Sequence, residues 1–109
     1  MCSFDTKHFN KGDLIIKEGE RSSEAFVINK GHVEVKKRTL DGEEVVIARL
    51  DPGQIFGEMS LFDNTNRSAS VYALSNVELS IIKKEDFLEY LNDTPPQINV
   101  IIELLLKRL

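Results

Sequence analysis

Three residues in one short stretch provide the groups that an anion-binding site needs. Gly57 lets the backbone come close to a ligand. A helical turn predicted from Glu58 to Phe62 would point free N–H groups at an anion, and Arg67 supplies a planar, permanently charged group that suits a phosphate. Glu58 is an acceptor that repels a bare phosphate but holds a hydroxyl. The stretch therefore predicts a site for a phosphodiester with a free ribose hydroxyl nearby.

The elements that must position these residues are short strands separated by turn residues. Lys30-Gly31 predicts a tight hairpin, and Leu40 to Glu43 predicts a second one. We expect the last two strands to pair with each other. Strand spacing of roughly ten residues indicates an antiparallel sandwich or roll. The strands are expected at 14–17, 25–29, 32–37, 45–50, 69–74 and 77–82.

The pattern becomes helical after the last strand. Lys84 to Leu91 has apolar residues at helical spacing, and Pro95 and Pro96 separate it from a second helix over Gln97 to Leu109. This second helix is apolar on nearly every side. It could cover the ligand, pair with a second subunit as a homodimer, or continue into a longer coiled coil, because all three use the same pattern.

Composition agrees with one small domain. The chain has 109 residues, 41% of them apolar, and a net charge of -4, so it offers no basic face for nucleic acid. Cys2 is the single cysteine, which excludes an intrachain disulfide and fits a cytoplasmic location. Apolar runs fall short of the roughly 20 residues of a membrane span. His8 and His32 lack partners at metal-ligand spacing, and no hydrolytic set of residues is found, so we expect no metal, no cofactor and no enzyme activity.

The motif around the glycine, the glutamate and the arginine resembles the phosphate-binding cassette of cyclic nucleotide-binding domains. That family includes catabolite-activator-type regulators, regulatory subunits of protein kinase A and cyclic-nucleotide-gated channels. The matching residues are Phe56-Gly57-Glu58 and Arg67-Ser68-Ala69-Ser70. The resemblance implies a mainly β fold, a jelly-roll-like double-stranded β-helix with a short cassette helix. It places a single domain at 1–109, with the β-roll at about 9–83 and the C-terminal helices at about 84–109.

The same resemblance implies the ligand-binding residues. Ser60 would offer its backbone N–H to the phosphate with its side chain incidental, while the Ser68 hydroxyl either contacts the ligand or is simply a small group that the turn requires. For Val35 and Ile47, an ordinary core role is as good an interpretation as a base contact. The implied set is Val35, Ile47, Ala48, Phe56, Gly57, Glu58, Met59, Ser60, Arg67, Ser68 and Ala69. The ligand is cyclic AMP or cyclic GMP, and we favour cyclic AMP.

A regulatory sensor is the function that this resemblance implies. Ligand binding would move the C-terminal helices and so reach an effector that this chain does not contain. The N-terminal helix expected before Phe9 is shortened to Met1 to His8, which indicates an excised or partial domain. One alternative is a degenerate module of the same fold that serves as a dimerisation or scaffold element. Another is a cupin-type enzyme, which would need a histidine cluster that two histidines do not supply.

Overall fold

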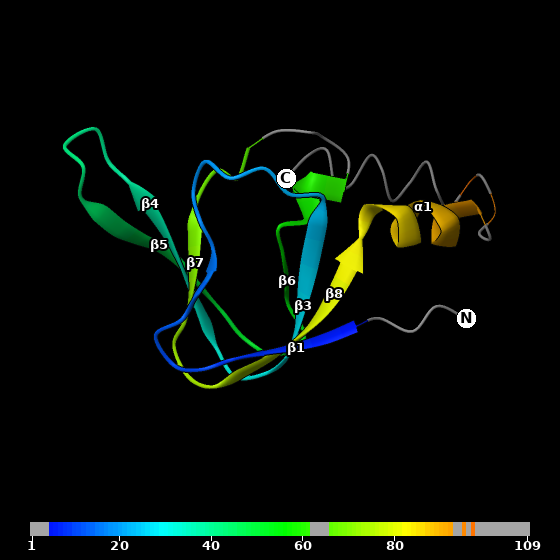
Figure 1. Cartoon of the computed structure of the whole chain (residues 1–109), viewed down its shortest axis with the longest axis horizontal. Coiled ribbons are helices and arrows are strands. Elements are labelled where there is room, and N and C mark those ends of the chain that lie inside the picture. Colours follow the sequence, from blue (N-terminus) through cyan, green and yellow to red (C-terminus); the bar gives the residue numbers. More distant parts are fainter. Residues whose placement is uncertain (1–4, 62–65, 93–94, 96, 98–109) are drawn as a thin grey trace.

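Two four-stranded antiparallel sheets form the protein. The computed structural model describes residues 5–61, 66–92, 95 and 97. Sheet A has the order β1 (Asp5–Phe9), β8 (Val77–Lys83), β3 (Glu24–Lys30) and β6 (Ile55–Phe56). Sheet B has the order β2 (Leu14–Ile16), β7 (Ser70–Ala73), β4 (Val33–Arg38) and β5 (Glu44–Leu50). A 3₁₀ helix, η1 (Glu58–Leu61), and a helix, α1 (Lys84–Asn92), complete the described elements (Figure 1). The predicted β-roll with a cassette helix and a C-terminal helix is confirmed.

The core lies between the two sheets and follows the alternation of the strands. In β8, Val77, Leu79 and Ile81 are buried, whereas the residues between them are partly exposed. Successive side chains of a strand point to opposite faces, so one face of each sheet turns toward the other sheet. Phe26 and Phe56 stack across β3 and β6 with their ring centroids 5.2 Å apart. The buried cluster comprises Ile16, Phe26, Ile28, Val33, Phe56, Val71, Ala73, Val77, Leu79 and Ile81.

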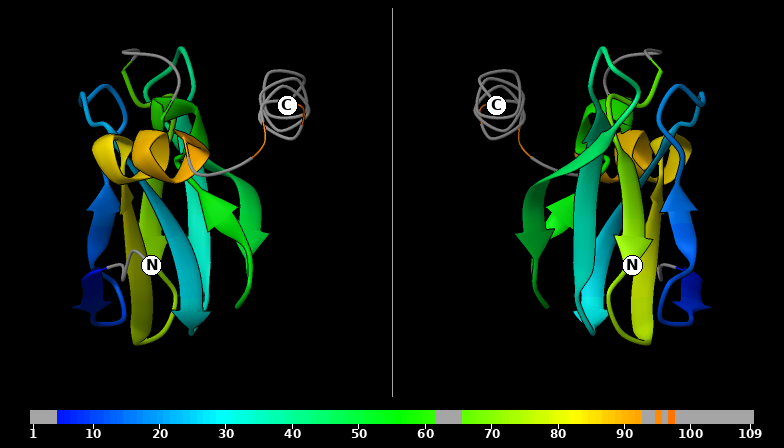
Figure 2. Two further views of the ribbon diagram at one scale, coloured as in Figure 1. Left: turned by 90° about the vertical axis from the view of Figure 1, so that its right-hand side faces the viewer. Right: turned by 90° about the vertical axis from the view of Figure 1, so that its left-hand side faces the viewer.

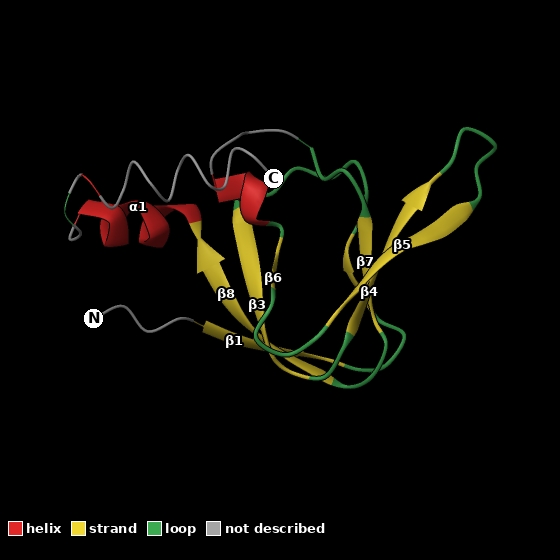
Figure 3. Cartoon of the chain, turned by 180° about the vertical axis from the view of Figure 1, so that it is seen from behind, coloured by secondary structure: helices red, strands yellow, loops and turns green. Residues whose placement is uncertain are grey.

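Strand pairing differs from the sequence-based expectation at two places. Lys30-Gly31 does not close a hairpin, because β3 belongs to sheet A and β4 to sheet B. The last two strands, β7 and β8, likewise lie in different sheets and do not pair. The hairpin predicted at Leu40 to Glu43 is confirmed, since β4 pairs with β5 on either side of it, and this hairpin projects from the roll (Figures 1 and 3). An alternating pattern shows which face of a strand is buried but not which strand lies beside it.

Residues 5–9 form a strand, although a shortened helix was expected over Met1 to His8, of which residues 1–4 lie outside the described part. Asp5 to Phe9 pairs along its length with Ile81 to Val77 of β8, so the roll includes residues before the expected start near residue 9. Four of its five residues are exposed, which is why the segment lacks the apolar alternation of an inner strand.

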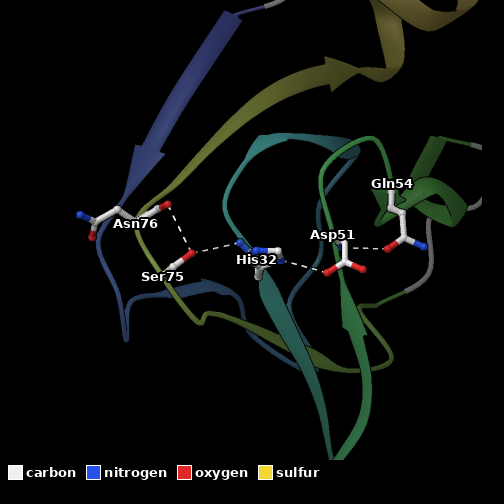
Figure 4. A network of polar contacts seen from close by, with 5 residues as sticks. All are labelled: His32, Asp51, Gln54, Ser75 and Asn76. Carbon is white, nitrogen blue, oxygen red and sulfur yellow. Dashed lines mark hydrogen bonds and ion pairs between the residues drawn. The ribbon is translucent and has the colours of Figure 1, made fainter.

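A network of polar contacts ties three loops together at the end of the roll opposite η1 (Figure 4). His32 Nδ1 lies 2.9 Å from Asp51 Oδ1, and the backbone N–H of His32 donates to Ser75 Oγ at 3.1 Å. The backbone N–H of Asp51 donates to Gln54 Oε1 at 2.7 Å. His8 makes its own contact, with Glu78 at 3.2 Å. Each histidine thus has a single carboxylate partner, and the described residues contain no cluster of three or more metal-ligating side chains.

The helical elements lie together at the end of sheet A where β3 begins and β8 ends (Figures 1 and 2). The backbone N–H of Lys84, the first residue of α1, donates to Ser23 O at 3.0 Å. Over the described residues, no helix combines the length and the apolar character needed to cross a membrane. The second predicted helix, 97–109, lies outside the described residues apart from residue 97, as do the three alternatives proposed for it.

We expect Gly31→Ala to destabilise the protein much more than Gly42→Ala. Both glycines have a φ near +87°, at 86° and 87°, so both substitutions strain the backbone. Only at Gly31 would a Cβ atom also clash with Asn76 O and lie 2.6 Å from Val77 Cγ1, whereas at Gly42 it would meet nothing within 4 Å. The expected losses in unfolding free energy are about 1 kcal/mol for Gly42→Ala and about 3 kcal/mol or more for Gly31→Ala. Urea denaturation measures both, and equal losses would contradict the packing argument.

Candidate functional site

A cavity of about 290 Å³ opens where the inner face of sheet B meets η1 and the segment before β7. One wall is apolar and comes from β2, β4, β6 and β7, while the other is polar and comes from η1 and residues 66–69. The lining residues are Ile16, Val35, Phe56, Gly57, Glu58, Ser60, Asn66, Arg67, Ser68, Ala69 and Val71. An apolar wall facing a few convergent polar groups is the usual composition of a small-molecule site.

Arg67 is the central polar residue of this cavity, and it is only 7% exposed. Its Nη1 donates to Gly57 O at 3.1 Å and to Ser60 Oγ at 2.6 Å, and its Nη2 donates to Glu24 O at 2.6 Å. Its Nε is buried and has no acceptor within the part of the chain that the structure describes. A buried N–H of a charged group without an acceptor is costly, so this side chain is set up to receive a further acceptor.

The backbone of Arg67 is held as firmly as its side chain. Its N–H donates to Glu20 O at 2.7 Å, and its carbonyl accepts from the N–H of Gly19 at 2.9 Å. Arg21 and Asn66 form an isolated β-bridge beside these two bonds. The turn between β2 and β3 therefore fixes the position of the arginine along the cavity rim.

Within the described part of the chain, the charge of Arg67 has no direct carboxylate partner. It forms no ion pair with any carboxylate in the described ranges. Burial lowers the pKa of Arg67 below the usual arginine value, and the negative charges of Glu24, Glu20 and Glu58 act in the opposite direction. Arginine stays charged in proteins even so. The cavity therefore presents a buried positive charge that an anion would compensate.

Gly57 is required by the close approach of the arginine. Its φ is +74°, a conformation that favours glycine. A Cβ atom at this position would lie 2.7 Å from Arg67 Nη1 and 3.3 Å from Glu24 O. The glycine thus allows the guanidinium to reach the carbonyl of residue 57, in addition to the close ligand approach inferred from the sequence.

Two neighbours of Gly57 in η1 differ in their roles. Glu58 lines the cavity, and its carboxylate makes no hydrogen bond to another described residue. The Ser60 side chain, expected to be incidental, is 5% exposed and accepts the Arg67 bond. The N–H of Ser60, expected to face the phosphate, donates instead to Gly57 O at 3.2 Å within the turn. The side chain is therefore not incidental, and the expected contact of the N–H with a phosphate stays a prediction.

Most of the predicted binding residues come together at the cavity, but Ile47 and Ala48 do not line it. Both lie on β5, an edge strand of sheet B, whereas the cavity lies over β2, β7 and β4. Ile47 is 55% exposed, and it has no cross-strand partner because the ladder shifts register after Val35. The side chain of Met59 lies outside the described residues. The predicted residues in the lining are Val35, Phe56, Gly57, Glu58, Ser60, Arg67, Ser68 and Ala69.

Sequence reasoning missed several groups at this site. Ile16 and Val71 face each other across β2 and β7, and their apolar alternation could have indicated the cavity wall. Asn66 directly precedes the arginine and also lines the cavity. The carbonyl of Glu24 carries no signal in the sequence, because every residue type has the same backbone oxygen.

Comparison with known proteins agrees with this geometry. The profile of the family described as cyclic nucleotide-binding domain matches residues 6–94. A cyclic AMP receptor protein of Thermus thermophilus is 33% identical over 109 residues, which cover 100% of this chain and 50% of that protein. A regulatory subunit of cAMP-dependent protein kinase from Mycosarcoma maydis is 42% identical over 71 residues, covering 65% of this chain and 13% of that protein. The chain thus spans half or less of these two relatives.

Solved structures show the same likeness. The cAMP-bound form of the EAL enzyme Bd1971 is 38% identical and superposes with a TM-score of 0.79, covering 95% of this chain and 28% of that one. Its cGMP-bound form is 39% identical, with the same TM-score and coverage. The domain therefore recurs within larger proteins of different kinds.

We expect Gly57→Ala to displace the Arg67 guanidinium and to destabilise the ligand-free protein more than Gly53→Ala does. Gly53 has a φ of +91° but nothing within 4 Å of a Cβ atom, so it controls for backbone strain alone. The expected loss in unfolding free energy is about 1 kcal/mol for Gly53→Ala. For Gly57→Ala the clash with Arg67 should add about 1 kcal/mol or more. Guanidinium chloride denaturation compares the two variants. Equal stability would show that the close approach of Arg67 is not a constraint.

Proposed function

The chain belongs to the cyclic nucleotide-binding domain family, and on that premise we propose that it binds a cyclic nucleotide, preferably cyclic AMP, in the cavity around Arg67. The observation that carries this proposal is the buried guanidinium, which lacks a carboxylate partner among the described residues and has an unpartnered Nε. A cyclic phosphate supplies one negative charge and two free oxygens on one phosphorus. It therefore meets both requirements of the site at once.

We assign roles to the lining residues by their chemistry. Arg67 binds the phosphate, and Glu58 accepts a hydrogen bond from the ribose hydroxyl. Ile16, Val35 and Val71 provide the apolar surface on which the base rests. Such a surface separates adenine from guanine poorly, because it contains no specific donor or acceptor. The preference for cyclic AMP follows the receptor and kinase relatives, whereas Bd1971 is known with both nucleotides.

We further propose a regulatory role and no catalysis by this domain. The family is one of regulatory ligand-binding domains, although one structural relative is named as an enzyme. A ligand shifts a conformational equilibrium only by its differential affinity for the two states. Here the shift would act on α1 and, through it, on an effector outside this chain. A single domain over 1–109, a homodimer through the C-terminal segment and a cytoplasmic location stay predictions.

Isothermal titration in phosphate-free buffer tests the proposal. Wild-type protein is expected to bind cyclic AMP with one-to-one stoichiometry, and cyclic GMP more weakly. Arg67→Ala should lose about tenfold to a thousandfold in affinity, since charge-assisted hydrogen bonds contribute about 1.5 to 3 kcal/mol each. Arg38→Ala is the matched control, because it removes the same charge from the hairpin, where Arg38 donates to Gly42 O.

The titration also separates the proposal from its alternative. Absence of heat and of thermal stabilisation with both nucleotides would favour a scaffold module of the same fold. Equal affinity of Arg67→Ala and wild type would move the binding site elsewhere on the molecule.

Glu58→Gln tests the ribose contact separately from the phosphate contact. Wild-type protein should bind 2′-deoxy cyclic AMP about tenfold more weakly than cyclic AMP, because a hydrogen bond to a charged acceptor is lost. Glu58→Gln should bind cyclic AMP more weakly and discriminate less between the two ligands. Glu43→Gln, an exposed change on the hairpin, should behave like wild type. Unchanged discrimination in Glu58→Gln would rule out the assigned role.

A further inference from the structure

Hydrogen bonds to described residues leave the Arg67 guanidinium one edge for a ligand. The group carries five N–H donors, and three of them are used by Gly57 O, Ser60 Oγ and Glu24 O. Both hydrogens of Nη1 are engaged, so a ligand meets Nε and the remaining hydrogen of Nη2. Two donors of a planar fork can hold two oxygens of one anion. The three acceptors, which we call the Arg67 clamp, therefore decide which edge faces the cavity.

Ser60 contributes the one side chain of this clamp, and the other two acceptors are backbone carbonyls. Its Oγ lies 2.6 Å from Nη1, and the two residues are 5% and 7% exposed. Without this hydroxyl, a hydrogen of Nη1 would lack an acceptor, and the guanidinium would then have two buried unpaired donors, Nε and Nη1. A buried donor in that position is costly, so the guanidinium would turn to find another partner.

We propose that Ser60 is a positioning residue, whose hydroxyl holds the Arg67 guanidinium so that its Nε edge points to the anionic group of the ligand. This inference rests on the proposed function for its ligand but not for the clamp itself. Ser60 need not touch the ligand, and its hydroxyl acts through Arg67. Loss of the hydroxyl should therefore weaken binding only while Arg67 is present.

The binding test compares Ser60→Ala with Ser75→Ala. Ser75 is half-buried at the opposite end of the roll, its hydroxyl also accepts a hydrogen bond, from the backbone N–H of His32 at 3.1 Å, and it does not line the cavity. By titration with cyclic AMP, Ser60→Ala should bind about three- to thirtyfold more weakly, which is part of the free energy that a hydrogen bond to a charged group contributes. Ser75→Ala should bind like wild type.

A double-mutant cycle identifies the route of the effect. Ser60→Ala should cause no further loss of affinity when introduced into Arg67→Ala, because the two residues then act as one unit. Independent losses that add would show that Ser60 acts on the ligand or on the fold and not through Arg67.

A second readout examines the clamp in ligand-free protein. The Nε–H resonance of Arg67, identified by its disappearance in Arg67→Lys, should exchange slowly with solvent because Nε is buried. In Ser60→Ala this exchange should be about tenfold faster or more, since the side chain is no longer held. In Ser75→Ala it should be unchanged. If Ser60→Ala does not fold, Ser60→Cys replaces it, because a thiol is nearly the same size but a weak acceptor.

The two readouts separate this inference from the proposed function. Wild-type affinity and unchanged Nε–H exchange in Ser60→Ala would overturn the positioning role. A wild-type protein that binds neither cyclic AMP nor cyclic GMP would overturn the proposed function. In that case, faster exchange in Ser60→Ala would still establish the clamp, and unchanged exchange would reject it.

Discussion

Burial of the Arg67 charge is the constraint on which the ligand end of this protein depends. A cation taken out of water without a carboxylate partner is costly by several kcal/mol, even after relaxation of its surroundings. Three oxygen acceptors, from β3, from the turn into η1 and from η1 itself, offset part of this cost. Each of them must be in place, and Gly57 must lack a side chain for the guanidinium to fit. One side chain thus sets the relative positions of three separate segments of the chain.

The opposite end of the roll is held by different means. There, Gly31 packs against the turn before β8, and His32 joins Asp51 and Ser75 across loops (Figure 4). These contacts involve no cavity residue, and the buried apolar cluster lies between the two ends. The fold therefore ties loops together at one end and, within the described residues, holds a buried charge without a direct carboxylate partner at the other. Functional sites commonly hold such locally unfavourable groups, supported by the rest of the structure.

The start of β3 connects the cavity to α1. Glu24 O accepts the hydrogen bond from Arg67, and the adjacent carbonyl of Ser23 accepts from the N–H of Lys84, where α1 begins. Glu24 also pairs with Lys83 at the end of β8. The carbonyl that accepts from the guanidinium and the carbonyl that accepts from the first N–H of the helix therefore belong to adjacent residues.

Local sequence pattern by itself determined where most of the elements lie, where the candidate anion site is and which family the chain resembles. Turn residues and apolar alternation located six of the strands within a residue or so, helical spacing located α1, and the Gly57, Glu58 and Arg67 spacing indicated the anion site and the family. Tertiary structure alone decided that β3 and β4 lie in different sheets, that Ile47 lies beyond the cavity, and that the Ser60 hydroxyl holds the arginine. Strand partners and the direction of a carbonyl such as that of Glu24 depend on contacts between residues distant in sequence, and backbone groups are the same for every residue type.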